Sequence, residues 1–247
     1  MKSLLKVAAI GVAAMGLAGT ANAAETLNIT SVKTLHSSPA YSATLKVDKP
    51  GSSNDIQTSG LLSPQLINGS LKAFCVDLAQ TAGTGTFTVK TLAEFLGSSS
   101  SAQYKALTAL VSNYGTTSNS VLLDAAVQLA VWEVLYEKAG NAFDVTKNQF
   151  SSSNWSDSTT SGPWWNQTTN SEVRNQANTL LASLGDLTDT GEWDFYVATN
   201  SKKQDLLYFV QRSPVPEPAT WGMMILGLGL VGASMRRRVS RTSVSFA

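Results

Sequence analysis

Cys75 is the only cysteine of the chain, and a lone thiol is the first feature that invites a chemical explanation. It can be a small buried hydrophobe, an intermolecular disulfide partner, a catalytic nucleophile or one half of an internal crosslink. A cysteine hydrolase would need the single histidine, His36, as its base, and the residues around His36 give that role no support. One Cys and one His also exclude a disulfide framework and a multi-cysteine metal site, so we expect no metal and no cofactor.

A second candidate lies in the apolar segment 121–136, which we expect to be helical. Its polar side chains, apart from a terminal tyrosine and the indole of Trp132, are Asp124, Gln128 and Glu133. At about 100° per residue, Asp124 and Gln128 share one face and Glu133 points the opposite way. Apolar neighbours surround Gln128, and a buried amide is costly unless it is paired. A thiol that attacks this amide, with loss of ammonia, would leave a Cys–Gln thioester; the alternative is an ordinary buried cysteine and an ordinary helix glutamine.

Two short segments carry a resemblance to a known family. Phe74-Cys75-Val76-Asp77, expected on a strand, is followed about fifty residues later by Val127-Gln128-Leu129-Ala130-Val131-Trp132 on the expected helix. This pair resembles the thioester domains of Gram-positive surface adhesins, over roughly residues 71–138. The resemblance implies that Cys75 is the thiol partner, Gln128 the acyl donor and Trp132 a packing residue near the bond. It also makes Asp77 a supporting residue.

The function implied by the resemblance is covalent adhesion or crosslinking rather than turnover. An amine on a surface protein or an amino sugar would attack the thioester, leaving Gln128 joined to the target and Cys75 free. Such a chain is a single-use binding module and not an enzyme. Asp124, one turn before Gln128, would orient the amine or polarise the amide, or it is a plain helix-surface carboxylate. The family often has Thr where this chain has Val127, a difference that bears on the target.

A Ser/Thr/Asn-rich stretch, residues 151–170, offers a different function. It contains Trp155, Trp164 and Trp165, whose indole faces could stack on sugar rings, or could fold back as a lid over the core. The first possibility gives the alternative hypothesis, a non-covalent protein that binds an exopolysaccharide or biofilm matrix.

The pattern of elements predicts an α+β fold, with a β-rich framework, sandwich or barrel-like, that carries an inserted helical block. We expect one such domain over residues 24–213. The expected strands cover residues 26–35, 41–47, 71–78, 86–91, 192–199 and 206–211, and the expected helices cover residues 101–114, 120–138 and 170–184.

Both ends of the chain are expected to be targeting segments. Residues 1–23 have two lysines, an apolar run and a small-residue cleavage site, which is typical of a secretory signal peptide. Near the other end, Pro216-Glu217-Pro218 precedes an apolar segment and an arginine cluster. This order resembles the PEP-CTERM sorting signal of Gram-negative bacteria, which we assign to residues 214–238 with a short transmembrane helix, followed by a cytoplasmic basic tail at 239–247.

The sorting signal implies an exosortase-type partner, a transient stay in the inner membrane and a final place at the cell surface or in the extracellular matrix. Charge excludes another class of partner. Six of the 18 Lys and Arg residues lie near the two ends, which leaves 12 Lys and Arg against 17 Asp and Glu over residues 24–218, a net charge of −5. A negative body without a basic run predicts no nucleic-acid binding.

Overall fold

The structure, a computed structural model, describes residues 25–36, 41–48, 56–116, 120–153, 170–212 and 218–236. The chain divides into two compact units, Met1–Val210 and Gln211–Ala247, which are described separately.

A seven-stranded sheet is the framework of the first unit, with the strand order β1-β7-β9-β10-β6-β5-β2. Neighbouring strands with a defined register pair antiparallel. The strands of this sheet are β1 (Thr26–Ile29), β2 (Val32–Thr34), β5 (Gln65–Ile67), β6 (Leu71–Cys75), β7 (Gly85–Thr91), β9 (Trp193–Asn200) and β10 (Lys203–Gln211).

The two outer strands of this sheet, β1 and β2, are consecutive in the sequence. Asn68, which lies in the turn between β5 and β6, stabilises the short segment that connects β1 to β2. Its Oδ1 accepts a hydrogen bond from the backbone N–H of Thr30 at 2.8 Å, and its Nδ2 donates to the carbonyl of Asn28 at 3.0 Å. Its own backbone N–H donates to the carbonyl of Ser31 at 3.0 Å. The sheet is therefore curled, with one short segment running from one edge to the other.

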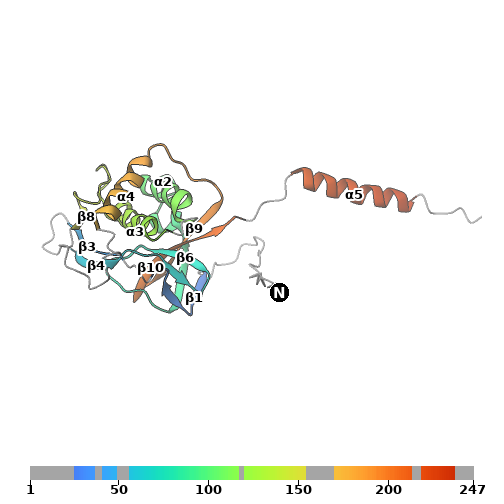
Figure 1. The fold of residues 1–247 in the computed structure, drawn as a ribbon. Coiled ribbons are helices and arrows are strands. Elements are labelled where there is room, and N and C mark those ends of the chain that lie inside the picture. Colours follow the sequence, from blue (N-terminus) through green and yellow to red (C-terminus); the bar gives the residue numbers. More distant parts are fainter. Residues whose placement is uncertain are drawn as a thin grey trace, which may run out of the picture. The chain divides into compact units, whose positions relative to one another are not determined.

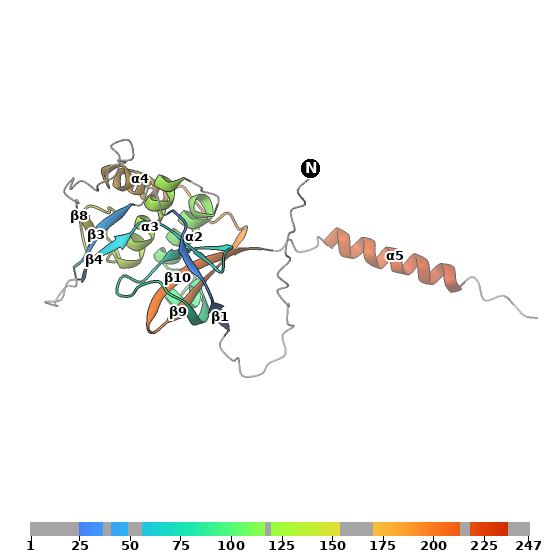
Figure 2. The ribbon, with the colours of Figure 1, turned by 60° about the horizontal axis from the view of Figure 1, so that its bottom comes forward.

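A second, three-stranded sheet has the order β4-β3-β8, and its strands are β3 (Ser42–Val47), β4 (Ile56–Leu61) and β8 (Phe150–Ser153). β3 is the central strand and pairs antiparallel with both neighbours. The three strands lie together in both Figure 1 and Figure 2. Because β8 comes from between two helices, the helical block and the β framework are interleaved in the sequence.

Helix α3 is the centre of the helical part and packs against α2, α4, β6 and β8. Its residues from Asp124 to Val134 are all buried, because the helix has neighbours on every side. Figure 1 shows α2, α3 and α4 gathered on one side of β6, β9 and β10. The helices of this unit are α1 (Leu92–Leu96), α2 (Ala102–Leu110), the π-helical turn η1 (Val111–Gly115), α3 (Val121–Tyr136) and α4 (Asn170–Ser183).

The predicted α+β class with a β-rich framework is confirmed, and the large sheet is curled. Several details differ from expectation. The strand expected over residues 26–35 is two strands, and the one expected over 71–78 ends at Cys75. The helix expected over 101–114 becomes a π-helical turn after Leu110. Strands β4, β5 and β8 and helix α1 were not expected.

Gly115, which the sequence indicates as a helix stop, has another role in the structure. A Cβ atom at this position would lie only 2.9 Å from Cε2 of Phe74, the residue that precedes Cys75. Its φ is not among the positive values that favour glycine in a left-handed helix cap. Close packing, rather than a special backbone conformation, therefore requires a glycine here.

The second unit contains helix α5 (Pro218–Arg236). The sequence predicts a short transmembrane helix here, and the structure corrects that prediction. Within the described part of the chain, no helix combines the length and the apolarity needed to cross a membrane. At about 1.5 Å per residue, the 19 residues of α5 reach about 28 Å, and glycines at four positions lower the hydropathy of the helix.

Candidate functional site

The structure brings Cys75 and Gln128 together through the main chain of Cys75. The backbone N–H of Cys75 donates to Oε1 of Gln128 at 2.9 Å. Nε2 of Gln128 in turn donates to the carbonyl oxygen of Cys75 at 2.8 Å. The side-chain amide is fully buried, and both of its polar atoms are satisfied by one residue. The predicted burial and pairing of Gln128 are both present.

The local strand pattern explains why Cys75 has a free main-chain N–H and C=O for this contact. Cys75 is opposite Leu206 of β10, but the ladder bond to β10 is made by the N–H of Val76, which donates to the carbonyl of Asp205 at 3.0 Å. The polar groups of Cys75 consequently point to the other side, where β5 begins only at Gln65, opposite Ala73. The Gln128 amide therefore takes the place of a missing strand partner.

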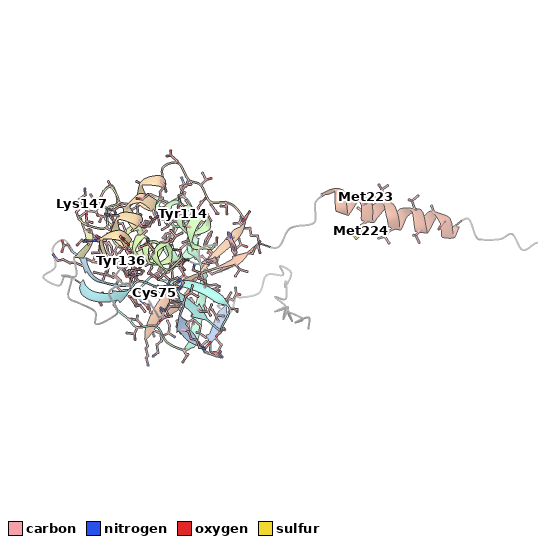
Figure 3. The ribbon with its side chains drawn as sticks, in the orientation of Figure 1. Cys75, Tyr114, Tyr136, Lys147, Met223 and Met224 are labelled. Atoms are coloured by element: carbon pink, nitrogen blue, oxygen red, sulfur yellow. The ribbon has the colours of Figure 1, made fainter. Side chains whose placement is uncertain are left out.

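The thiol of Cys75 is buried, with 3% of the residue exposed, and Figure 3 shows the residue near the middle of the unit. Burial raises the pKa of the Cys75 thiol to about 12; a hydrogen bond with the Gln65 side chain lowers it, and the charge of Asp77 raises it further. We expect thioester formation to need thiolate character at Cys75, because the thiolate is the nucleophilic form of the side chain. The structure differs, because desolvation outweighs the one favourable hydrogen bond.

Asp124 is fully buried and holds two side chains from distant parts of the chain. Its Oδ2 lies 2.7 Å from Nε2 of His36, and its Oδ1 lies 2.5 Å from Nζ of Lys72. The interpretation of Asp124 as a plain helix-surface carboxylate is wrong, because α3 is covered on this face by β6 and by residue 36. Burial lowers the pKa of Lys72, and the hydrogen bond to Asp124 opposes that shift.

His36 is thus placed beside Asp124, with its side chain 15% exposed. The described contacts of its ring join it to Asp124 and not to Cys75. A catalytic pair of cysteine and histidine needs the base within hydrogen-bond reach of the sulfur and a lowered thiol pKa. The contacts of His36 and the raised pKa of Cys75 both run against the hydrolase hypothesis.

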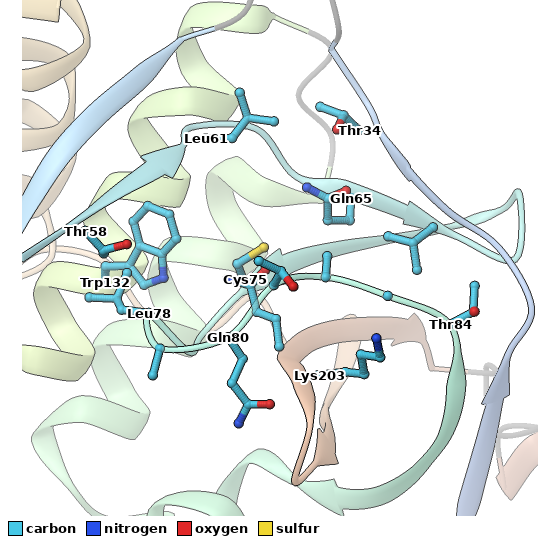
Figure 4. Close-up of a pocket in the computed structure, with 16 residues that line it drawn as sticks. Thr34, Thr58, Leu61, Gln65, Cys75, Leu78, Gln80, Thr84, Trp132 and Lys203 are labelled. Carbon is cyan, nitrogen blue, oxygen red and sulfur yellow. The ribbon is translucent and has the colours of Figure 1, made fainter.

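Trp132 lies one turn beyond Gln128 on α3 and is 1% exposed. It lines a cavity together with Cys75, as Figure 4 shows. Asp77 caps the turn after β6, where its Oδ1 accepts a hydrogen bond from the N–H of Ala79 at 2.7 Å. Its influence on the Cys75 thiol is electrostatic.

Two buried carboxylates, one in α3 and one directly after its last residue, have structural roles that were not expected from the sequence. Glu133, expected on the opposite face from Gln128, is fully buried, and its Oε1 accepts from the N–H of Asp144 at 2.7 Å. Burial raises the pKa of Glu133 to about 8. Glu137 accepts hydrogen bonds from the N–H groups of Lys138 and Phe150, both at 3.0 Å. Both carboxylates hold the chain between α3 and β8.

Other predicted residues cannot be placed. Trp155, Trp164, Trp165, Pro216 and Glu217 lie outside the described residues, so the tryptophan-loop hypothesis stays a prediction; Pro218 begins α5. Among the described residues, no group of three or more His, Cys, Asp or Glu side chains is placed to hold a metal ion.

Comparison with known proteins identifies one segment. Residues 214–238 match the PEP-CTERM protein-sorting motif. No curated protein and no solved structure shows significant similarity to the chain. The findings define an exported protein with an α+β body and a C-terminal sorting signal.

The motif specifies its route further. It implies recognition by an exosortase-type sorting enzyme, export across the inner membrane and a place at the cell surface or outside the cell. The predicted localisation is thereby confirmed, and the predicted sorting partner is supported by the same match.

Proposed function

We propose that the body of this protein is a covalent attachment module, in which Cys75 and Gln128 form an internal thioester that captures an amine on a target. The observation that carries the proposal is the double hydrogen bond between the Gln128 amide and the main chain of Cys75. It fixes the acyl group beside the residue whose thiol would attack it. Such fixation can supply a large effective molarity.

The contacts suit thioester formation at each atom. Sulfur of Cys75 would attack Cδ of Gln128, the C–N bond would break, and the nitrogen would leave as ammonia with the thiol proton. The backbone N–H of Cys75, already on Oε1, would stabilise the negative charge that develops on that oxygen. Because its pKa is raised, the Cys75 thiol would start protonated, and its proton would pass to the leaving nitrogen as the sulfur attacks.

The direction of attack is also favourable. The Gln128 amide forms its two hydrogen bonds in the plane that contains the N–H and C=O groups of the strand. A side chain of a strand points out of that plane. From there, rotation about the Cα–Cβ bond would bring the Cys75 sulfur over one face of the amide, the side from which a nucleophile approaches a carbonyl carbon.

Capture of a target would run in the reverse sense. An amine nitrogen would bond to Cδ of Gln128, the C–S bond would break, and the sulfur of Cys75 would take a proton from the amine. The neighbours of Gln128 on α3, Val127 and Leu129, are fully buried, so they support the exclusion of competing water. The product is an amide, and each molecule would act once.

Intact mass of the exported protein tests the proposal. We expect the wild-type chain to be lighter than its sequence by one ammonia, and Cys75→Ala and Gln128→Ala to have full mass. Methylamine should add to the wild type at Gln128 only. The matched control is Gln103→Ala, which removes an amide that donates to Val134 and Leu135 elsewhere; it should keep the mass loss. A wild type with full mass and an alkylatable Cys75 would reject the thioester.

A further inference from the structure

A cavity of about 730 Å³ opens over the side chain of Cys75. Its wall is formed by the end of β6, the chain that follows it through residues 78–84, and the start of β10. Figure 4 shows Cys75 in this wall, with Trp132, Gln65 and Lys203 around it. A molecule that enters this cavity would contact the side chain of Cys75, to whose sulfur the acyl group of the proposed thioester would be joined.

Two residues of the cavity wall have a buried polar atom that lacks a protein partner. Nε1 of Trp132 is buried and has no hydrogen-bond partner among the described residues, and the same holds for Oε1 of Gln80. Both residues line the cavity. An indole N–H can only donate and an amide oxygen can only accept, so the wall offers one donor and one acceptor. A hydroxyl group, which both donates and accepts, can satisfy either atom.

The charge of the cavity narrows the choice of ligand. Its polar lining consists of neutral amides and hydroxyls, with Gln65, Gln80 and Thr58 as examples, and one cation, Lys203. No acidic side chain lines it among the described residues. A lysine ammonium from a target protein would therefore find no counter-ion and would meet a like charge.

We propose that this cavity binds an amino sugar of a polysaccharide and presents its free amine to the Gln128 acyl group, an inference that rests on the proposed thioester. The sugar hydroxyls would pair with Trp132 and Gln80. The amine of a 2-amino sugar is less basic than that of lysine, because the neighbouring oxygens withdraw electrons. More of it is neutral near pH 7, and Lys203 favours the neutral form further. The amine nitrogen bonds to Cδ of Gln128, the C–S bond of the thioester breaks, and the proton lost by the nitrogen passes to the sulfur of Cys75.

The binding step is tested separately from the reaction, in the full exported chain carrying Cys75→Ser. Nitrogen-15 NMR resolves the indole N–H groups of the six tryptophans, and the Trp132 signal is assigned by its loss in Trp132→Phe. We expect glucosamine to shift the Trp132 signal and Nα-acetyl-lysine methylamide to leave it unchanged. No shift with glucosamine, or a larger shift with the lysine compound, would overturn the sugar assignment.

The reaction is tested in the wild-type chain by the rate at which Gln128 gains mass. Glucosamine should react faster than the lysine compound at equal concentration, and N-acetylglucosamine, which lacks a free amine, should not react. Trp132→Phe and Gln80→Ala should each lower the rate with glucosamine, relative to the rate of the same variant with methylamine, about tenfold, the effect of one lost hydrogen bond. Trp193→Phe is the matched control, because that ring packs on Phe209 and does not line the cavity.

The two proposals fail in different ways. If methylamine does not add to the wild type, the thioester fails, and the NMR measurement still decides whether the cavity binds the sugar. If methylamine adds but the lysine compound outpaces glucosamine, the thioester stands and a protein target replaces the amino sugar.

Discussion

Burial of the Cys75 thiol affects both the lifetime of the proposed thioester and its reaction with an amine. Its pKa is raised to about 12, chiefly by burial. A thiol with a high pKa is a poor leaving group as thiolate, so a thioester made from it resists attack unless a proton is delivered to the sulfur. The attacking amine would supply that proton during capture, because its N–H becomes acidic once the nitrogen bonds to Cδ of Gln128, whereas excluded water would not. The buried sulfur thus favours a long-lived bond that reacts with the intended target.

Glu133 carries a prediction about pH. Its folded-state pKa of about 8 lies above the ordinary value of 4.5, so the folded chain binds a proton that the unfolded chain releases. The free energy of unfolding should therefore fall as pH rises from about 4.5 to about 8. Glu133→Gln should remove this loss and raise the Tm at pH 8 by roughly 2–4 °C, with little change at pH 4.

Thermal unfolding followed by circular dichroism at pH 4, 6 and 8 measures the effect. The control is Glu172→Gln, which neutralises an exposed glutamate on α4 and should leave the pH profile unchanged. A wild-type Tm that is equally high at pH 6 and pH 8 would contradict the role of Glu133.

At the scale of elements, the strongly patterned segments could be predicted from the sequence. The apolar run of α3 and the alternation of β3 and β7 are local signals. The strands that were not expected lack them, because β8 reads Phe-Ser-Ser-Ser and owes its structure to pairing with β3. One signal was present and missed: Asn68 and Gly69 have φ values of 51° and 74°, and an Asn-Gly pair is typical of the hairpin turn that joins β5 to β6.

The candidate site likewise combines residues that could be predicted from the sequence with contacts that could not. Cys75 and Gln128 could be found because each lies in a short segment of recognisable pattern. His36 and Asp124 lie 88 positions apart, and their contact depends on how α3 packs on the sheet. No local sequence pattern could therefore predict it. The cavity lining likewise comes from several separate segments.

The contact between η1 and β6 carries the second prediction. Gly115→Ala would place a methyl group 2.9 Å from the Phe74 ring, and overpacking of this kind costs about 1–3 kcal/mol. We expect a lower free energy of unfolding in urea and, because Phe74 positions Cys75, slower loss of ammonia from the new chain. Gly185→Ala is the control, since no atom lies within 4 Å of its added methyl group. Equal stability of the two variants would show that Phe74 can move away without cost.

At the scale of the whole molecule, the sorting signal determines where the body ends up. Replacing Pro216, Glu217 and Pro218 together with alanine should leave export intact and prevent sorting, because the proline motif lies within the matched signal. We expect at least tenfold less protein at the cell surface, and a retained form that still carries residues 214–238 by mass spectrometry. Ser213→Ala, just outside the matched residues, should be sorted normally; a triple variant that reaches the surface unchanged would contradict the prediction.

The curled sheet has a consequence for a protein that is sorted to the cell surface or outside the cell. Open sheet edges present unpaired N–H and C=O groups to which other chains can add, and this is a common route to aggregation. Here β1 and β2 form both edges from one short segment, and Asn68 ties that segment to the adjacent turn. Because this link joins the two edges, we expect the seven-stranded sheet to resist edge-to-edge pairing between copies of the protein.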